Sequence, residues 1–496
     1  MDAKAIEREV IVIQFNTLVD QARKRAVFLG VIVAMVMIAP VVQAQLLFTP
    51  PQKLSSNSAS SHFAGEQLIA VDALGNINIV WLESTNSANV MFSRSIDGGL
   101  TFSTPINLSN NPSGAIGPSL ALDASGNIYV AWSGVANFAN GATAIFFTRS
   151  TDGGSTFSTP VNVSGPQPAV GASGQSMILD SGGNVYLVWS GSFDNNSLTY
   201  GPVFFSLSSD GGATFSPPVQ VSNDQTQRAQ VAVDASGNID VVWYESVNGG
   251  GGHDPVFFSQ SSDRGATFST PITVSGDTFF PPEQQMTVDS QGNIYVVENL
   301  DPTQNGVDRD VWLAYSSDGG TTFSMTNISN NPGSNGPTQG QIALDSAGNV
   351  NVVWVEPTQL QIFYRRSTDG GATFSDPVNV SNDSFGYIEN PQIIADPGGN
   401  INVVWDQNTG QFFDILFSRS SDGGSTFSSP QNISHDQGNS VTPVMAVDSL
   451  ADAYFVWRDD SPHQNPPVWN IFFSRDVSFP VLNLNRKHRL PPARLR

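Results

Sequence analysis

Residues Ser420 to Phe427 read Ser-Ser-Asp-Gly-Gly-Ser-Thr-Phe, and close copies of this stretch recur along most of the chain. A Ser and an Asp two residues apart can bond nearby backbone amides, and the second Gly supplies a positive φ, so the stretch has the chemistry of a tight hairpin turn. A repeat of 51 to 58 residues predicts an array of structural units. We therefore expect a structural role for the seven aspartates Asp97, Asp152, Asp210, Asp263, Asp318, Asp369 and Asp422.

Each unit also contains a second hairpin, upstream of this turn. A short apolar strand ends in Asp, a Gly-Asn turn follows, and a second strand closes on Trp, as in Ile77 to Trp81. A variable loop and a Phe-rich strand then lead to the Asp-containing turn and a fourth strand. Turn residues bound runs of alternating apolar residues throughout, which is the pattern of β-strands.

Four antiparallel strands repeated in tandem predict the blades of a β-propeller. The upstream hairpin occurs eight times, which indicates eight blades, with a seven-bladed ring and one displaced unit as the alternative. Residues 48–55 align with the fourth strand at 102–109 but lack the three strands before it. We expect this N-terminal strand to complete the last blade and close the ring, which removes an open sheet edge. The predicted fold class is all-β, with a single propeller.

Composition excludes several classes of function. The chain of 496 residues has no cysteine, so it has no disulfide framework and no thiolate metal site or nucleophile. Residues 45–485 hold 11 basic and 39 acidic residues. Such a charge repels nucleic acid and anionic membrane, and we expect neither as a partner of the propeller.

The two ends of the chain differ from the propeller. Arg23-Lys24-Arg25 precedes an apolar run from Ala26 to Val42, and Val42-Gln43-Ala44 fits a small-residue cleavage site. Residues 1–44 are thus predicted to be a signal peptide, or alternatively an N-terminal anchor. The propeller is expected over 45–485, followed by a basic disordered tail at 486–496. We expect a monomer that is secreted or periplasmic.

The pattern S-x-D-x-G-x-T-F between the third and fourth strands of a blade resembles the Asp-box, or bacterial neuraminidase repeat. With the flanking strands, the resemblance covers about residues 48–485. It implies a sialidase-like β-propeller whose Asp-boxes lie on the face away from the active site. The family includes sialidases, other glycosidases, receptors and proteins with no known activity, so the resemblance implies the fold more strongly than the function.

A sialidase needs an arginine cluster to clamp the carboxylate of its sugar, together with a Tyr/Glu pair and an Asp. The Phe/Tyr-Arg-Ile-Pro motif of that family is absent. Arginines that depart from the repeat pattern at the expected variable-loop face are Arg228, Arg309 and Arg458. They are candidate ligand-binding residues, and the alternative is that each pairs with a neighbouring acid.

Acids follow the second strand in most blades, including Glu245 and Asp459, which are further candidate ligand-binding residues. The whole set would ring one mouth of the channel, and we interpret it as a solvated acidic rim: Glu83, Glu245, Glu298, Glu356, Asp406 and Asp459. Tyr244 precedes Glu245, but neighbours on a strand point to opposite faces, which disfavours that Tyr/Glu pair.

Two further sets of side chains fall in the variable loops. A calcium ion could bind among oxygen ligands in the last unit, although no tight ligand spacing supports it: His435, Asp436, Asp459, Asp460 and His463. No other cofactor is indicated. Loop aromatics could stack on sugars, anchor a protein or cover the blades: Phe138, Phe193, Phe279, Phe280, Phe385, Tyr387, Phe412 and Phe413.

These features favour a non-catalytic binding module for a glycan or an extracellular protein, with no catalytic residue assigned. The alternative is a sialidase-like glycoside hydrolase of the exo-α-sialidase type. A purely structural envelope protein is a third hypothesis, and it predicts no concave site.

Overall fold

The computed structural model describes residues 47–55, 63–84, 87–110, 114–137, 142–165, 172–192, 200–222, 226–245, 255–275, 284–301, 309–330, 336–382, 386–435, 437–462 and 467–477. The chain divides into two units, Met1–Ala44 and Gln45–Arg496, and all described residues belong to the second. The predictions for 1–44 and for 486–496 fall outside the described residues. Among the described residues, no helix is long and apolar enough to cross a membrane.

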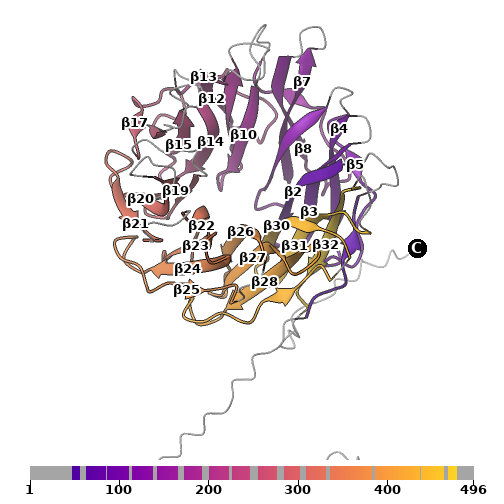
Figure 1. Cartoon of the computed structure of the whole chain (residues 1–496). Helices are drawn as coiled ribbons and strands as arrows, with labels where there is room; N and C mark the ends of the chain where they lie inside the picture. The colour runs from indigo at the N-terminus through magenta and orange to yellow at the C-terminus, as the bar shows by residue number, and fades with distance from the viewer. Residues whose placement is uncertain are drawn as a thin grey trace, which may run out of the picture. The chain divides into compact units, whose positions relative to one another are not determined.

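The second unit contains eight four-stranded antiparallel sheets arranged as the blades of a propeller (Figure 1). Blades one and two are β2 (Phe63–Val71), β3 (Ile77–Ser84), β4 (Ala88–Ser95) and β5 (Ile106–Asn107), then β6 (Ala115–Leu122), β7 (Ile128–Asn137), β8 (Ala142–Ser150) and β9 (Val161–Asn162). Blades three and four are β10 (Ala172–Leu179), β11 (Val185–Ser192), β12 (Tyr200–Ser208) and β13 (Val219–Gln220), then β14 (Thr226–Val233), β15 (Ile239–Glu245), β16 (Val256–Ser261) and β17 (Ile272–Thr273).

Blades five and six are β18 (Gln285–Val288), β19 (Ile294–Leu300), β20 (Asp310–Ser316) and β21 (Ser324–Asn327), then β22 (Thr338–Leu344), β23 (Val350–Glu356), β24 (Gln361–Ser367) and β25 (Val378–Asn379). Blades seven and eight are β26 (Ile388–Ala395), β27 (Ile401–Asn408), β28 (Phe413–Ser420) and β29 (Gln431–Asn432), then β30 (Ser440–Val447), β31 (Ala453–Asp459), β32 (Asn470–Arg475) and β1 (Gln52–Lys53). The eighth blade thus takes its outer strand from the N-terminal end of the propeller.

The ring closes by strand pairing between the two ends of the propeller. Gln52 of β1 pairs with Phe473 of β32, and a further bridge joins Phe48 to Asp476. The expectation of eight blades closed by an N-terminal strand is confirmed, and the seven-bladed alternative is wrong. Closure leaves the third strand of blade eight paired on both sides, so no long strand edge is exposed there.

The hydrophobic core lies between neighbouring blades rather than within one sheet. One buried cluster, for example, combines Ile77 and Trp81 of blade one with Tyr454 and Phe473 of blade eight. Within blades, the Trp that ends a second strand stacks on its cross-strand partner, as Trp132 does on Phe146 at a centroid distance of 6.1 Å. Each blade therefore needs its neighbour to bury its apolar faces.

The Asp-box turns form a uniform hydrogen-bonded structure. In blade two, Ser150 donates to Asp152 at 2.8 Å, and the backbone and hydroxyl of Thr156 donate to the same carboxylate at 2.9 and 2.6 Å. These bonds lower the pKa of Asp152 to about 2. The Phe that follows packs edge-on against the preceding blade, with Phe157 4.9 Å from Phe92. Both carboxylate oxygens are engaged in the turn, which gives Asp152 a structural role.

Because successive strands alternate in direction, the Asp-box turns and the turns between first and second strands lie on one face, here named the Asp-box face. The opposite face, here named the loop face, carries the connections between second and third strands and between blades. Arginines just before the Asp-boxes act on the Asp-box face: Arg94 forms an ion pair with Asp72 at 2.9 Å, and Arg149 donates to the carbonyl of Asp210 in the next blade at 3.0 Å.

Candidate functional site

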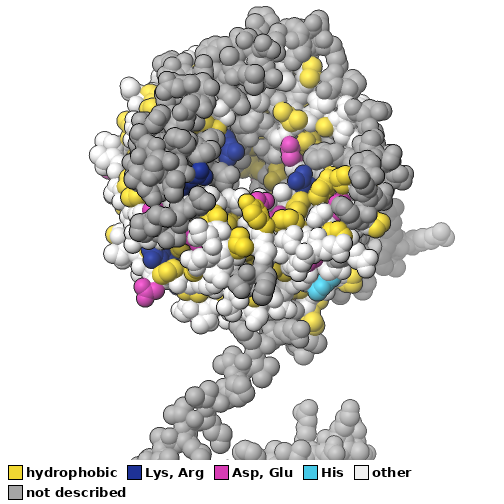
Figure 2. Space-filling view, in the orientation of Figure 1, with side chains coloured by type: hydrophobic (Ala, Val, Ile, Leu, Met, Phe, Trp, Pro, Cys, Tyr) yellow, Lys and Arg dark blue, Asp and Glu magenta, His cyan; other side chains and the backbone are white. Residues whose placement is uncertain are grey.

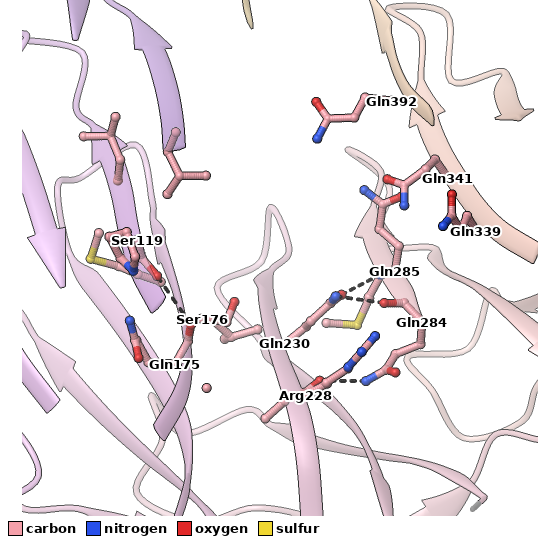
Figure 3. A pocket seen from close by; sticks show the side chains of 18 of the residues that line it. Ser119, Gln175, Ser176, Arg228, Gln230, Gln284, Gln285, Gln339, Gln341 and Gln392 are labelled. Carbon is pink, nitrogen blue, oxygen red and sulfur yellow. Dashed lines mark hydrogen bonds between the residues drawn. The ribbon is translucent and has the colours of Figure 1, made fainter. Parts of the chain in front are cut away.

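A pocket of about 780 Å³ lies in the central channel and is lined by the first strands of seven blades. Figure 2 shows this hollow at the middle of the ring, with several basic side chains around it. The wall combines aliphatic side chains with amides, and the single cation that lines it among the described residues is Arg228 (Figure 3). The amide side chains are Gln175, Gln230, Gln284, Gln285, Gln339, Gln341, Asn390 and Gln392.

In every blade except blade five, the first strand enters the channel through a β-bulge that sets one residue in the left-handed region. In blades two and three this residue is glycine, Gly117 and Gly174. In blade four it is Arg228, with φ of 51°, and in blades six and eight it is Gln339 and Thr442. A positive φ costs a non-glycine residue free energy, and such strain is commonly found at functional sites. The bulges therefore place strained backbone at the loop-face end of the channel.

Glutamine side chains join the first strands of neighbouring blades. Gln230 donates to the carbonyl of Gln284 at 2.9 Å and accepts from the amide of Met286 at 2.8 Å, both in blade five. In return, Gln284 donates to the carbonyl of Arg228 at 2.6 Å (Figure 3). First strands are open sheet edges, so these side chains satisfy backbone groups that would otherwise be unpaired. Similar bonds link Gln175 to Gly117, Gln285 to Ile342 and Gln392 to Met445.

The three candidate arginines do not converge. Arg228 is exposed and lines the pocket, whereas neither Arg309 nor Arg458 does. Arg458 belongs to blade eight, opposite blade four in the ring, and its guanidinium lies 4.8 Å from the ring centre of Trp469. Burial lowers the pKa of Arg458, and Asp406 partly offsets that effect. A three-arginine clamp of the sialidase kind is therefore not assembled.

The acids after the second strands are buried, so the interpretation as a solvated rim is wrong. Glu245 is buried and accepts the indole N–H of Trp243 at 3.0 Å. Asp459 is fully buried and accepts from Ser440 at 2.5 Å and from the indole of Trp457 at 3.3 Å. Residues two apart on a strand share a face, which brings acid and indole together. Neither Glu245 nor Asp459 lines the pocket.

Tyr244 and Glu245 point in different directions, as expected for neighbours on a strand. The phenol of Tyr244 donates to Gln227, while Glu245 lies beside the indole of Trp243. The two residues therefore do not form a Tyr/Glu pair of the kind that a sialidase uses.

The structure gives the calcium hypothesis no support. Asp436 and His463 lie outside the described residues, and Asp459 and Asp460 accept hydrogen bonds from Ser440 and Asn439. Among the described residues, no group of three or more metal-binding side chains is gathered. Of the loop aromatics, Tyr387 is exposed and Phe412 and Phe413 are partly buried, and the others lie outside the described residues.

Strand order and the seven repeated turns define the chain as an eight-bladed β-propeller of four-stranded antiparallel blades. No protein-family model and no curated protein matches its sequence. Among solved structures, the NanB sialidase from Streptococcus pneumoniae is similar at 12% identity over 86% of this chain and 71% of its own, with a TM-score of 0.39. The intramolecular trans-sialidase from Ruminococcus gnavus is similar at 15% identity over 73% and 94%, with a TM-score of 0.40.

A protein of unknown function from Dyadobacter fermentans is similar at 15% identity over 62% of this chain and 95% of its own, with a TM-score of 0.41. At these identities and TM-scores the similarity carries no argument by itself. The strand pairing of the chain itself defines the fold, and the fold alone does not define a function.

Proposed function

We propose that this protein is an exported, non-catalytic binding module that takes a glycan at the loop-face end of its central channel. One observation carries the proposal: the pocket of about 780 Å³ is lined by amide side chains from several blades and by Arg228. That volume is in the range of ordinary ligand sites, roughly 300–1,000 Å³. The pocket also argues against a purely structural role, which predicts no concave site.

The chemistry of the wall suits a hydroxylated ligand. A glutamine amide both donates and accepts, as sugar hydroxyls do, and Gln285, Gln341 and Gln392 are partly exposed to the pocket. Arg228 adds a fork of donors that suits a carboxylate or sulfate on the glycan. Because the amides of Gln285 and Gln392 are held by bonds to the next blade, they lose little side-chain freedom when a ligand binds.

The same lining disfavours hydrolysis. A glycosidase of the common type needs two carboxylates flanking the scissile bond. Among the described residues that line the pocket, none is Asp, Glu or Tyr. The nearby acids of the second strands are buried in the blades, where Glu245 and Asp459 are bonded to indoles. Binding without turnover is the function that this wall supports best.

A glycan array probed with residues 45–496 tests the proposal, with calorimetry on any glycan that is retained. Arg228→Gly is the informative variant, since blades two and three carry glycine at this bulge and the change removes the cation without adding strain. We expect at least about a tenfold loss of affinity for an anionic glycan, because hydrogen bonds to charged groups contribute about 1.5–3 kcal/mol.

Arg264→Gly is the matched control. Arg264 also has a positive φ, stands where the other Asp-boxes have glycine, and lies on the Asp-box face. Its replacement should leave binding unchanged. Retention of no glycan, or equal losses from both variants, would contradict the proposal. Turnover of aryl glycosides that Arg228→Gly abolishes would instead establish the hydrolase alternative.

A further inference from the structure

On the Asp-box face, the aspartate that follows a first strand accepts a hydrogen bond from a side chain of its own blade, beyond the bonds of its turn. The donor is the residue six positions further on or the residue before the Ser of the Asp-box, as in Tyr186 to Asp180 at 2.8 Å and Arg366 to Asp345 at 2.7 Å. The pairs in five other blades are Arg94 to Asp72, Tyr129 to Asp123, Tyr295 to Asp289, Asn402 to Asp396 and Tyr454 to Asp448. Seven of the eight blades thus place a donor against this carboxylate.

Blade four has neither donor. The residue six positions after Asp234 is Asp240, and the residue before the Ser of the Asp-box is Gln260. Gln260 donates to Oδ1 of Asp240 at 2.8 Å. Asp240 is fully buried, and its Oδ2 has no hydrogen-bond partner among the described residues. In blade four a second carboxylate therefore stands where the other blades have a donor.

The carboxylates of Asp234 and Asp240 lie close together in the first hairpin of blade four. Side chains at the position of Asp240 reach the corresponding aspartate elsewhere, as Asn402 does at 3.1 Å from Oδ2 of Asp396. Burial raises the pKa of Asp240 to about 7, with a further upward contribution from the charge of Asp234. No described lysine or arginine forms an ion pair with either acid. Two acids thus share one junction without a compensating cation from the described part of the chain.

In blade six an arginine guanidinium occupies the same junction. Arg366 donates to Oδ2 of Asp345 and also to the carbonyl of Gly423, in the Asp-box of the next blade, at 3.0 Å. The counterpart of Gly423 beside blade four is Gly319, and a Cβ placed on Gly319 would lie 3.6 Å from Oε1 of Gln260. Gln260 has no positive charge, so the oxygens that a guanidinium bridges in blade six are left without a cation in blade four.

We propose that a calcium ion binds between blades four and five, held by the carboxylates of Asp234 and Asp240 and the carbonyl of Gly319. Calcium prefers oxygen ligands of this kind and completes its coordination with water. The ion replaces the missing guanidinium and compensates two charges that repel one another.

The surroundings of this site suit a cation. Asp234 and Gly319 are partly exposed on the Asp-box face, which gives the ion a path from solvent to the buried Asp240. The strongly acidic propeller attracts cations over a longer range. The site lies on the face opposite the loop-face end of the channel and far in sequence from the residues of the last unit considered for calcium above. It does not depend on the proposed binding of a glycan.

Calorimetric titration of CaCl2 into residues 45–496, after treatment with EDTA and its removal, tests this proposal. We expect one ion per propeller and a melting temperature that rises by a few degrees at saturation, because the ion binds the folded chain alone. Magnesium should bind more weakly, since it demands a more regular geometry. Asp240→Asn should weaken calcium binding at least about tenfold. Blades one, six and seven carry Asn at this position, so the fold accommodates the change.

Gln260→Arg supplies the guanidinium that other blades have. It should abolish calcium binding and give, without calcium, a melting temperature close to that of the calcium-loaded parent. The control is Glu298→Gln, which removes a different fully buried carboxylate, in blade five, and should leave the response to calcium unchanged.

The absence of both binding heat and a melting shift with CaCl2 overturns the proposal. So does an equal response in the parent and in Asp240→Asn, which would place the ion elsewhere. A parent that ignores calcium and is stabilised at neutral pH by Asp240→Asn would also overturn it, because the two acids would then share a proton instead of an ion.

Discussion

Trp81 donates its indole N–H to the carboxylate of Glu83, two residues further along the same strand, at 2.8 Å. The same relationship joins Trp243 to Glu245 at 3.0 Å, and Trp405 to Gln407 at 3.0 Å. A buried indole N–H needs an acceptor, and a side chain two positions on lies on the same face of the strand. Three of the acids that were interpreted as a solvated rim, Glu83, Glu245 and Asp459, are thus acceptors for tryptophan.

This relationship predicts that an amide can replace the carboxylate. Glu245→Gln should retain most of the stability, because Gln407 already serves as acceptor in blade seven. Glu245→Ala leaves the indole of Trp243 unpaired and should lower the free energy of unfolding by about 1–3 kcal/mol. Urea denaturation measures both. Equal losses from the two substitutions would show that the charge of Glu245, and not its acceptor role, is what matters.

Blade five predicts an unusual dependence of stability on pH. Glu298 stands in place of the tryptophan, is fully buried, and accepts from Ser275 at 2.6 Å. Burial raises its pKa to about 8 from an ordinary value of 4.5. Between these values the folded protein binds more protons than the unfolded chain, so the free energy of unfolding decreases as pH rises. Burial raises the pKa of Asp240 and Asp406 to about 7, with the same sign.

We therefore expect the melting temperature to be higher near pH 5 than at pH 8, as checked by calorimetry. Glu298→Gln should raise the melting temperature at pH 8 by a few degrees and flatten this slope, because the amide cannot ionise. The Asp-boxes limit the stability of the propeller in acid. Protonation of Asp152, which has a pKa of about 2, removes hydrogen-bond acceptors that its turn needs. A melting temperature that rises steadily from pH 5 to pH 8 would contradict the burial of an ionisable Glu298.

Two glycines separate the cost of backbone strain from the cost of crowding between blades. Gly154, in an Asp-box, has φ of 78°, and a Cβ there would lie 2.6 Å from the ring of Phe92 in the preceding blade. Gly183 has φ of 77° and open space around it. Gly183→Ala should cost about 1–2 kcal/mol from φ alone. Gly154→Ala should cost about 1–3 kcal/mol more, because it also overpacks the core. Similar unfolding curves for the two variants would refute the role of the Asp-box as an anchor between blades.

The glutamine bonds of the channel predict coupling between blades. Gln230→Ala removes two bonds to blade five and should destabilise the propeller by about 1–3 kcal/mol. Gln341, which lines the same pocket, has no such bond to a neighbouring blade among the described residues, so Gln341→Ala should change stability little. Thermal unfolding distinguishes the two. Equal melting temperatures would mean that Gln230 acts as part of the ligand surface alone.

Closure of the ring predicts the effect of removing its N-terminal strand. A chain that starts after Ser55 lacks β1, which exposes the edge of β32 and removes Phe48 from its contacts with Phe417 and Phe455. Exposed strand edges pair with other chains, so we expect a lower melting temperature and concentration-dependent aggregation in light scattering. A monodisperse, equally stable product would indicate that another segment takes the place of β1.

The repeat determined the fold because its signals are local. A tight turn such as Ser420 to Phe427 needs its residues within a few positions of one another, and alternation of apolar residues marks a strand without any distant partner. The likeness of 48–55 to a fourth strand, and the incomplete last unit, were enough to predict the closing strand. Residue type and spacing alone predict this closing strand, and the pairing of Gln52 with Phe473 confirms it.

Tertiary structure decided which polar residues reach the ligand pocket. Arg228, Arg309 and Arg458 are all exceptions to the repeat, yet of the three only Arg228 lines the channel pocket. The three residues belong to different blades, and the place of each blade in the ring determines whether its side chain can reach the pocket. The sequence pattern predicts Glu245 and Asp459 in a solvated rim, but both side chains are buried inside the blades. The glutamines were visible as recurring residues of the first strands, but their partners lie in the next blade, more than fifty residues away. Burial and partners across blades depend on the packing of the whole ring, which a local pattern does not contain.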